Sequence, residues 1–446
     1  MTSRSSALSR LLADYGMVVV LALLCAFFSF ATHTDQHPTG TDAARQLAAS
    51  ITSQFGKSAR VLIAVPSQSD AAAFADTLEA TLTKAGVTVV ATVKGEPKDA
   101  RAAMQTAASA GKLDAIATTQ ASAAWLVFAD LPTDFPALGK PPIVQPQTYR
   151  WPNFLKRDNL LNIANQIAVI AIVAIGMTLV IVGGGIDLSV GSLIALSAVV
   201  TGVLIRDGFG GTDAGSFGMI IASLLAIAAS GVAGAINGGL VTRFGLPPFI
   251  VTLAMMLVAS GGAFLLSHGQ SVYQVPDSFV WLGRGADFLS LPNAVVLMVL
   301  LYLGAHIVMT RTVLGRYIYA VGGNRLAAEY SGVPIRRVLL ATYVASGLLA
   351  GLGGVLLASQ LKSGAPTYGG MYELYVIAAV VVGGASLNGG SGRMFGTLIG
   401  AFTIAVIQNG MNLMNVESYT QKVVLGLVIL GAVLLDQLRR RASQRV

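Results

Sequence analysis

The sequence predicts an all-α polytopic membrane protein with about ten transmembrane helices and one small inserted α/β domain. The chain of 446 residues is 54% hydrophobic and 11% charged, with a mean hydropathy of +0.70, whereas an ordinary soluble domain carries about a quarter charged residues. Its apolar residues gather in runs of about 20, which is the length that a helix needs to cross a bilayer. Residues 33–158 contain no such run.

Apolar runs mark the candidate spans in chain order. They lie near residues 14–32, 160–182, 188–206, 217–241, 247–267, 292–310, 337–359, 371–384, 394–413 and 421–437. The first run follows Arg4 and Arg10, as in a signal peptide, but no small-residue cleavage site comes after it. We therefore expect a retained first span, encoded with the N-terminus in residues 1–33.

Between the first two spans, residues 34–150 are expected to form a small soluble domain outside the cytoplasm. Apolar, β-branched segments predict strands at 60–67, 86–93 and 113–119, and helical patterns lie at 68–85, 98–111 and 121–130. Strands that alternate with helices predict a parallel βαβαβ arrangement.

The distribution of basic residues predicts the orientation of the chain in the membrane. When the ten spans are threaded with the N-terminus inside, most arginines flank the cytoplasmic ends, and the tail 439–446 is cytoplasmic too. The positive-inside rule therefore predicts that both termini are cytoplasmic and that 151–438 is the main transmembrane domain. The net charge of +8 is then an orientation signal and predicts no nucleic-acid partner.

A glycine run and an aspartate interrupt the apolar sequence GMTLVIVGGGIDLSVGSLIALSAVV, residues 176–200. Gly184 and Gly185 permit the backbone to leave the helix, and Asp187 is placed to accept an N–H from Ser189 as a new helix begins. A carboxylate at membrane depth is costly and marks a functional candidate. Asp187 has three possible roles: a helix cap, a solute contact, or a group in gating or subunit contact.

A second interruption, VVVGGASLNGGSGRMFGTLIGAF at 380–402, repeats this arrangement. Broken apolar segments at corresponding places in two halves indicate a transport pathway. The candidates here are Gly383, Gly384, Ser386 and Asn388. Glycines four residues apart, among them Gly396, also suit close packing of helices in lipid.

The loop TRTVLGRYIYAVGGNRLAAEYSGVPIRR, residues 310–337, is the longest expected cytoplasmic segment. Asn324 can cap a short helix that ends at Gly332 and is stopped by Pro334. Such a helix either docks in a groove of a partner protein or belongs to an ordinary solvated loop.

No catalytic pattern is present. The sequence has no G-x-x-x-x-G-K-[ST] phosphate loop and no HExxH or G-x-S-x-G motif, and it holds one cysteine and four histidines. We therefore expect no catalytic residue, no cofactor and no metal site.

Three segments in order, IGMTLVIVGGGIDLSVGS, GRYIYAVGGNRLAAEYSGVPIRR and ELYVIAAVVVGGASLNGGSG, resemble the ribose/xylose/autoinducer-2 permease family of bacterial ABC importers. The resemblance covers about residues 150–440. It implies a type II importer fold in the cytoplasmic membrane and import of a sugar-like solute, with ATP hydrolysis in a separate subunit. The implied partners are cytoplasmic ATPase subunits, an extracytoplasmic solute-binding protein and a second permease copy or paralogue.

The resemblance also makes the segment from Gly322 to Gly332 the coupling helix that contacts the ATPase. The expected contact residues are Gly322, Asn324, Ala327, Ala328, Glu329 and Gly332. The insert has no counterpart in the usual family member; it could bind sugar itself, dock the binding protein, or have no role in transport. Two other functions remain open, an ion-coupled secondary carrier that uses Asp187 and a membrane-anchored solute sensor.

Overall fold

The computed structural model describes residues 3–443, and the side chains from residue 16 onward as far as residue 434, with residue 432 excepted. The expected tail 439–446 therefore lies partly outside the described residues. The chain divides into two compact units. We call residues 1–32 with 153–446 the membrane unit, and residues 33–152 the inserted unit.

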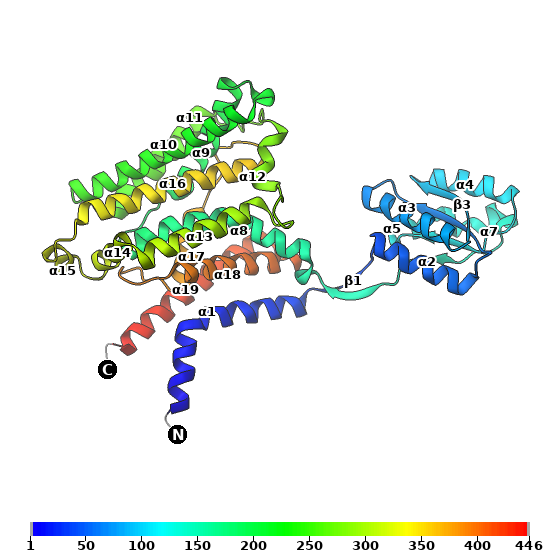
Figure 1. Cartoon of the computed structure of the whole chain (residues 1–446), viewed down its shortest axis with the longest axis horizontal. Helices are drawn as coiled ribbons and strands as arrows, with labels where there is room; N and C mark the ends of the chain where they lie inside the picture. Colours follow the sequence, from blue (N-terminus) through cyan, green and yellow to red (C-terminus); the bar gives the residue numbers. More distant parts are fainter. Residues whose placement is uncertain (1–2, 444–446) are drawn as a thin grey trace. The chain divides into compact units, whose positions relative to one another are not determined.

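The membrane unit is helical (Figure 1). Its helices are α1 (Ser3–Ala31), α8 (Arg157–Val182), α9 (Val190–Val203), α10 (Ser216–Arg243), α11 (Pro248–Leu266), α12 (Trp281–Arg284), α13 (Asn293–Arg311), α14 (Val313–Gly323), α15 (Arg325–Tyr330), α16 (Ile335–Leu361), α17 (Tyr372–Val382), α18 (Met394–Leu413) and α19 (Ser418–Ser443). Among the described residues, seven helices are long and apolar enough to cross a membrane: α8, α9 with its π-helical extension to Gly208, α10, α11, α13, α16 and α18.

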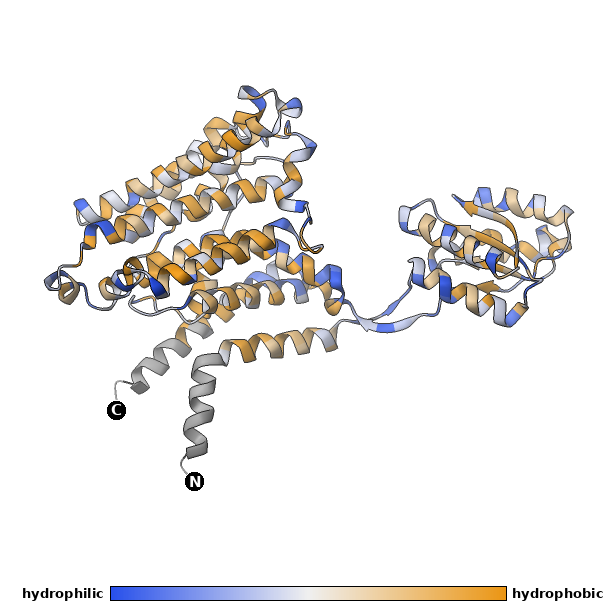
Figure 2. Cartoon of the chain, in the orientation of Figure 1, coloured by the Kyte–Doolittle hydropathy of each residue, from blue (hydrophilic) through white to orange (hydrophobic). Residues whose placement is uncertain are grey.

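Burial separates the central helix from the outer ones. The apolar window of α8 is 83% buried, whereas those of α11 and α13 are 22% buried although their hydropathy is similar. Exposed apolar side chains lie along both outer helices, such as Leu257 and Val258 of α11 and Leu300 of α13, and Figure 2 shows that the membrane unit is largely hydrophobic. Exposed apolar helix surface of this kind is stable against lipid tails and not against water.

Helices α10 and α16 pack side by side through small residues (Figure 1). A Cβ atom on Gly234 would lie 2.3 Å from the Tyr343 carbonyl oxygen, and one on Gly347 would lie 2.4 Å from the Ser230 carbonyl oxygen. The backbones therefore approach more closely than alanine would allow, which is how helices gain packing energy where lipid removes the hydrophobic drive between them.

The inserted unit is an α/β domain with a parallel sheet. Its elements are β1 (His33–Gln36), α2 (Thr41–Phe55), β2 (Arg60–Val65), α3 (Ser69–Lys84), β3 (Thr88–Lys94), α4 (Pro97–Ser109), β4 (Ala115–Thr118), the short helices α5 (Gln120–Ala123), α6 (Leu126–Ala129) and α7 (Leu131–Asp134), β5 (Ile143–Val144) and β6 (Tyr149–Pro152). The sheet order is β3-β2-β4-β5, with every pairing parallel. Helices α2 and α3 pack on one apolar face, and α4 with α6 on the other.

An antiparallel ribbon holds the two ends of the inserted unit together. His33 of β1 pairs with Pro152 of β6. Directly inside the membrane unit, the Asn153 N–H donates to the Thr32 carbonyl oxygen at 2.9 Å, and the Thr32 hydroxyl accepts from the Phe154 N–H at 3.1 Å. The chain thus leaves α1 and returns toward α8 at adjacent points.

Several expected boundaries differ from those in the structure. The expected span 371–384 corresponds to the eleven-residue helix α17, and the described apolar parts of α1 and α19 are Gly16–Ala31 and Ser418–Gly431. Helices α2 and α14 were not predicted, although each buries one apolar face: Ala44, Leu47 and Ile51 in α2, and Ile318 and Val321 in α14.

Candidate transport pathway and coupling site

Helices α8 and α17 end in the same hydrogen-bond pattern. At each end three successive N–H groups bond back to the last turn: Gly183, Gly184 and Gly185 to Leu179, Ile181 and Val180, and Gly383, Gly384 and Ala385 to Ala379, Val381 and Val380. Gly184 has φ of +85° and Gly384 has φ of +88°. This is the left-handed C-terminal cap in which glycine carries no steric penalty. The two interruptions predicted from the sequence therefore share one backbone geometry.

Asp187 follows the first interruption and is fully buried. Its Oδ1 accepts the Ser189 N–H at 3.0 Å and the Ser189 hydroxyl at 2.6 Å, and its Oδ2 accepts the Ser346 hydroxyl of α16 at 2.8 Å. Among the ion pairs of the described residues, none includes Asp187. The carboxylate thus joins the residues before α9 to α16 through neutral donors. The bond to the Ser189 N–H forms an Asx turn ahead of α9, whose own cap residue is Ser189.

Three buried polar groups on other helices were missed from the sequence. Asn237 of α10 donates to the Ser189 hydroxyl oxygen at 3.0 Å, and Ser346 binds Asp187. The Tyr343 hydroxyl lies against Gly185, where a Cβ atom would be only 2.5 Å away. The Asn237 Oδ1 and the Tyr343 hydroxyl have no partner among the described residues. Asn237 could have been found from the sequence, because it is a lone polar residue in an apolar helix.

The second interruption continues as a tight loop. The Ser386 hydroxyl accepts the Asn388 N–H at 3.1 Å, and the Ser386 N–H donates to the Ser391 carbonyl oxygen at 2.9 Å. A side chain that accepts the N–H two residues on occurs in both interruptions, from Asp187 to Ser189 and from Ser386 to Asn388. Ser386 is buried and Asn388 is exposed.

Gly322, near the end of α14, joins the two interruptions. A Cβ atom on Gly322 would lie 1.8 Å from the Val182 carbonyl oxygen and 2.6 Å from the Gly390 nitrogen. The Gly390 N–H itself donates to the Val182 carbonyl oxygen at 2.8 Å. Three backbone segments from distant parts of the sequence thus meet in direct contact, and we call Val182, Gly322 and Gly390 the glycine junction. No side chain fits between them.

Gly396 and Gly400 pack α18 against the end of α17. A Cβ atom on Gly396 would lie 2.2 Å from the Gly383 carbonyl oxygen, and one on Gly400 would lie 2.1 Å from the Ala379 carbonyl oxygen. The close helix packing predicted from the glycine spacing is therefore present.

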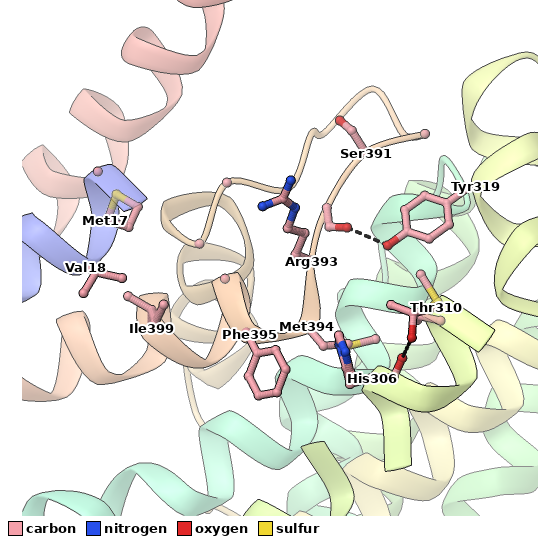
Figure 3. A pocket seen from close by; sticks show the side chains of 17 residues that line it. Met17, Val18, His306, Thr310, Tyr319, Ser391, Arg393, Met394, Phe395 and Ile399 are labelled. Atoms are coloured by element: carbon pink, nitrogen blue, oxygen red, sulfur yellow. Dashed lines mark hydrogen bonds between the residues drawn. The ribbon is translucent and has the colours of Figure 1, made fainter. Parts of the chain in front are cut away.

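A cavity of about 870 Å³ lies beside the second interruption, between α1, α13 and α18 (Figure 3). Figure 3 shows Tyr319 of α14 reaching the loop, where its hydroxyl donates to the Gly392 carbonyl oxygen at 2.6 Å. Burial raises the pKa of the Tyr319 phenol, so the hydroxyl stays protonated and keeps this bond. His306 packs on Phe395 with ring centroids 4.6 Å apart. Tyr319 is thus a second link between α14 and the interruption.

The expected coupling segment is two helices and not one. Gly322 belongs to α14, and α15 is only Arg325–Tyr330. Asn324 separates them and caps α15, its Oδ1 accepting the Ala327 N–H at 3.0 Å. Gly332 ends the segment with φ of +80°. The last turn of α14 does not continue into α15, because Gly322 in that turn is held in the glycine junction.

The exposure of α15 corrects part of the expected contact surface. Ala328 is only 4% exposed, so its side chain faces inward. Asn324, Ala327, Glu329 and Gly332 are exposed. Two exposed apolar residues were not anticipated, Leu326 at 67% and Tyr330 at 90%. An apolar face presented at a loop end is typical of a docking surface.

The candidate residues divide between two cavities. A second cavity, of about 320 Å³, is lined by Gly184, Gly185, Gly322, Asn388 and also by Arg325 of α15. Gly383 and Gly384 line the larger cavity in Figure 3 instead. Asp187 and Ser189 line neither of these two cavities, because they are buried among α9, α10 and α16.

Paired helix interruptions joined to a short exposed helix define the membrane component of a transport system, and comparison with known proteins names its family. The family model described as branched-chain amino acid transport system / permease component matches residues 159–433. The chain belongs to this family. The match begins after the inserted unit.

Several of the curated relatives are named as sugar permeases. The ribose import permease protein RbsC of Escherichia coli K12 is 43% identical over 289 residues, which are 64% of this chain and 87% of the relative. RbsC of Bacillus subtilis 168 is 44% identical with the same coverage. The D-allose permease AlsC of Escherichia coli K12 is 38% identical over 64% of this chain and 85% of the relative. No solved structure matches.

These relatives decide between the functions that the sequence left open. The chain is the permease subunit of an ABC importer, a multi-pass protein of the bacterial inner membrane, and as a permease subunit it is not itself an enzyme. The importer therefore replaces the ion-coupled carrier and the solute sensor as the function of the chain.

Proposed function

We propose that this permease carries a neutral sugar across the membrane and that ATPase subunits drive it through α15. The observation that supports this most directly is the glycine junction. Asn324, the cap of α15, follows Gly322 by two residues, and Gly322 has no free space against either interruption. A displacement of α15 by a partner should therefore move the end of α8 and the loop that follows α17, and a partner can bias a two-state element in this way.

The sugar class comes from the relatives, whose names state ribose, allose and arabinose. In such importers the solute arrives with an extracytoplasmic binding protein and ATP is hydrolysed by cytoplasmic subunits. We propose these partners for the present chain, together with a second permease copy or paralogue and surrounding lipid.

The ten-span topology with both termini in the cytoplasm is part of the proposal. The seven long helices and three shorter apolar helices supply ten segments. With the N-terminus inside, α14, α15 and the glycine junction lie at the cytoplasmic face, and the inserted unit lies outside. The bias of arginine toward the inner loops supports this orientation.

The role of Asp187 follows from its contacts. We propose that it acts within the first interruption by fixing the start of α9 to α16, so that Gly184, Gly185 and Ser189 move as one group with Ser346. Gly383, Gly384, Ser386 and Asn388 form the corresponding group at the second interruption. Both groups would gate the inner end of the pathway.

Co-purification with the ATPase tests this function. The permease is expressed with its ATPase subunits, reconstituted in liposomes and supplied with loaded binding protein; ATP turnover and D-ribose uptake are measured together. We expect turnover that rises with the loaded binding protein and uptake that requires ATP. A permease that never associates with an ATPase, or that concentrates sugar without one, would contradict the proposal.

A further inference from the structure

A cavity of about 500 Å³ lies at the ends of α8, α16 and α18 that are far from the glycine junction. Its walls come from Ile163 to Ile170 of α8, Leu357 to Leu361 of α16, and Ala405 to Asn412 of α18, with Tyr372, the first residue of α17. The α8 residues lie about 18 Å or more along the helix from Val182. In the proposed topology this cavity is at the outer face.

Carboxamides dominate the polar wall of this cavity. Six of the lining side chains are amides: Gln166, Gln360, Gln408, Asn409, Asn412 and Gln421. Tyr372 adds a phenol and Ser418 a hydroxyl, and of the described residues that line the cavity none is charged. An amide offers two donors and an acceptor without a charge, so this wall presents both kinds of hydrogen-bonding group.

Two of the charged residues that adjoin wall residues in sequence are engaged elsewhere. Lys362, which follows the wall residue Leu361, pairs with Asp277. The Glu373 carboxylate, which follows Tyr372, lies over Gly191 of α9, where a Cβ atom would be 2.3 Å from its Oε2. Glu417 and Lys422 adjoin the wall residues Ser418 and Gln421 of α19, but both are exposed and neither lines the cavity.

The amides fall into two groups. Asn409 exchanges hydrogen bonds with Asn159 of α8 at 3.0 and 2.8 Å, and Gln421 donates to the Asn412 Oδ1 at 2.7 Å. Gln360 of α16 donates to the Asn165 carbonyl oxygen of α8 at 2.9 Å. These four amides hold helices together. Within the described part of the chain, the side chains of Gln166 and Gln408 make no hydrogen bond, although both line the cavity. Their donors and acceptors are available to a solute.

From this arrangement we infer that the amide-lined cavity is an entry site for a neutral polyhydroxylated solute, with Gln166 and Gln408 as its direct hydrogen-bonding partners. The inference rests on the proposed function and adds to it a place and a set of contacts. A sugar hydroxyl both donates and accepts, as the amides do, and the volume falls within the range of small-molecule sites. A zwitterionic amino acid would leave two charges without partners in this cavity.

Helix α17 gives the site a route to the interruptions. It begins with Tyr372 at the cavity and ends at Gly383, where α18 packs through Gly396. The helix has eleven residues and is about 16 Å long. It therefore connects the solute contacts at its first residue to the second interruption at its end.

Cysteine protection tests the location. In a Cys25→Ser chain assembled with its ATPase, Gln166→Cys and Gln408→Cys are reacted with a membrane-impermeant thiol reagent, with and without millimolar D-ribose, D-allose, L-arabinose or L-leucine. Gln270→Cys, on the exposed loop after α11, is the matched control. We expect at least one sugar to slow modification several-fold at both cavity positions and not at the control. No protection by any sugar, or protection by leucine alone, would overturn the inference.

Transport by conservative variants gives an independent measurement. Gln166→Leu and Gln408→Leu keep the side-chain size and remove its hydrogen bonds, so each should raise the KM for sugar about three- to tenfold, while Gln270→Leu should not. If wild-type liposomes take up sugar and both variants match them, only the entry site is wrong. If wild-type liposomes take up no sugar, the proposed function fails with it.

Discussion

The Gly390 N–H donates a 2.8 Å hydrogen bond to the Val182 carbonyl oxygen. The two residues are far apart in sequence, and each belongs to a different interruption of the membrane helices. The bond closes over Gly322, which stands against both atoms. The two interruptions and the end of α14, which leads into α15, are therefore in direct backbone contact. An alanine in place of a junction glycine tests how closely they are packed.

Gly322→Ala should damage this unit. Its Cβ would meet the Val182 carbonyl oxygen at 1.8 Å, and the partners are backbone atoms that cannot turn aside. Backbone displacement of this kind costs about 1–3 kcal/mol or more, so we expect a lower Tm in detergent and reduced coupled ATP turnover. Gly323→Ala is the matched control, because its Cβ meets nothing within 4 Å. Equal Tm values for the two variants would contradict the junction.

Gly396→Leu should separate α18 from α17. The added side chain would begin 2.2 Å from the Gly383 carbonyl oxygen, so the helices must move apart and we expect a low yield of assembled transporter by size-exclusion chromatography. Gly304→Leu on α13 has open space around its Cβ and should give a normal yield. A wild-type yield for Gly396→Leu would show that this packing is dispensable.

Tyr330→Ala should uncouple the transporter without unfolding it. The side chain is 90% exposed on α15, so its loss removes little internal packing but removes an aromatic group that a partner can bury. We expect a normal Tm with ATP turnover that no longer responds to loaded binding protein. Tyr273→Ala, at another exposed tyrosine (68%), should stay coupled. Ala328→Glu should instead lower the Tm, because Ala328 is buried.

The sequence predicted the broken helices well and their contacts poorly. Gly184, Gly384 and Asp187 were found because glycine pairs and a carboxylate are conspicuous in apolar sequence. Ser346 and Tyr343 could not be found in this way, because a serine and a tyrosine in a long helix say nothing about which distant residue they touch. Ala328 was expected at a partner contact, and its burial was not predicted, because a helix of six residues is too short for its sequence to show which face is buried.

Two substitutions of Asp187 should distinguish the contribution of its hydrogen bonds to stability from the contribution of its charge. Asp187→Ala leaves the buried Ser189 N–H and two hydroxyls without their acceptor, at about 1–3 kcal/mol for an unsatisfied buried group, and should lower the Tm. Asp187→Asn keeps one acceptor oxygen toward Ser189, and the Ser346 hydroxyl can turn to accept from the new amide, so a smaller loss is expected. If the two variants melt alike, the charge matters more than the bonds.

Impermeant labelling should report the orientation. In the Cys25→Ser background, Ala80→Cys in the inserted unit should react in intact cells, whereas Ser331→Cys beside α15 should react only after permeabilisation, because both positions are exposed but lie on opposite sides in the proposed topology. The reverse pattern would invert the whole arrangement and exclude contact between α15 and a cytoplasmic ATPase.

The pairing of His33 with Pro152 brings the two ends of the inserted unit together. Because the chain leaves and re-enters the membrane unit at adjacent points, residues 33–152 could be removed without changing the path of any helix. The hydrogen bonds from Thr32 to Asn153 and Phe154 lie within the membrane unit and would remain. A turn of about two or three residues could therefore replace the inserted unit.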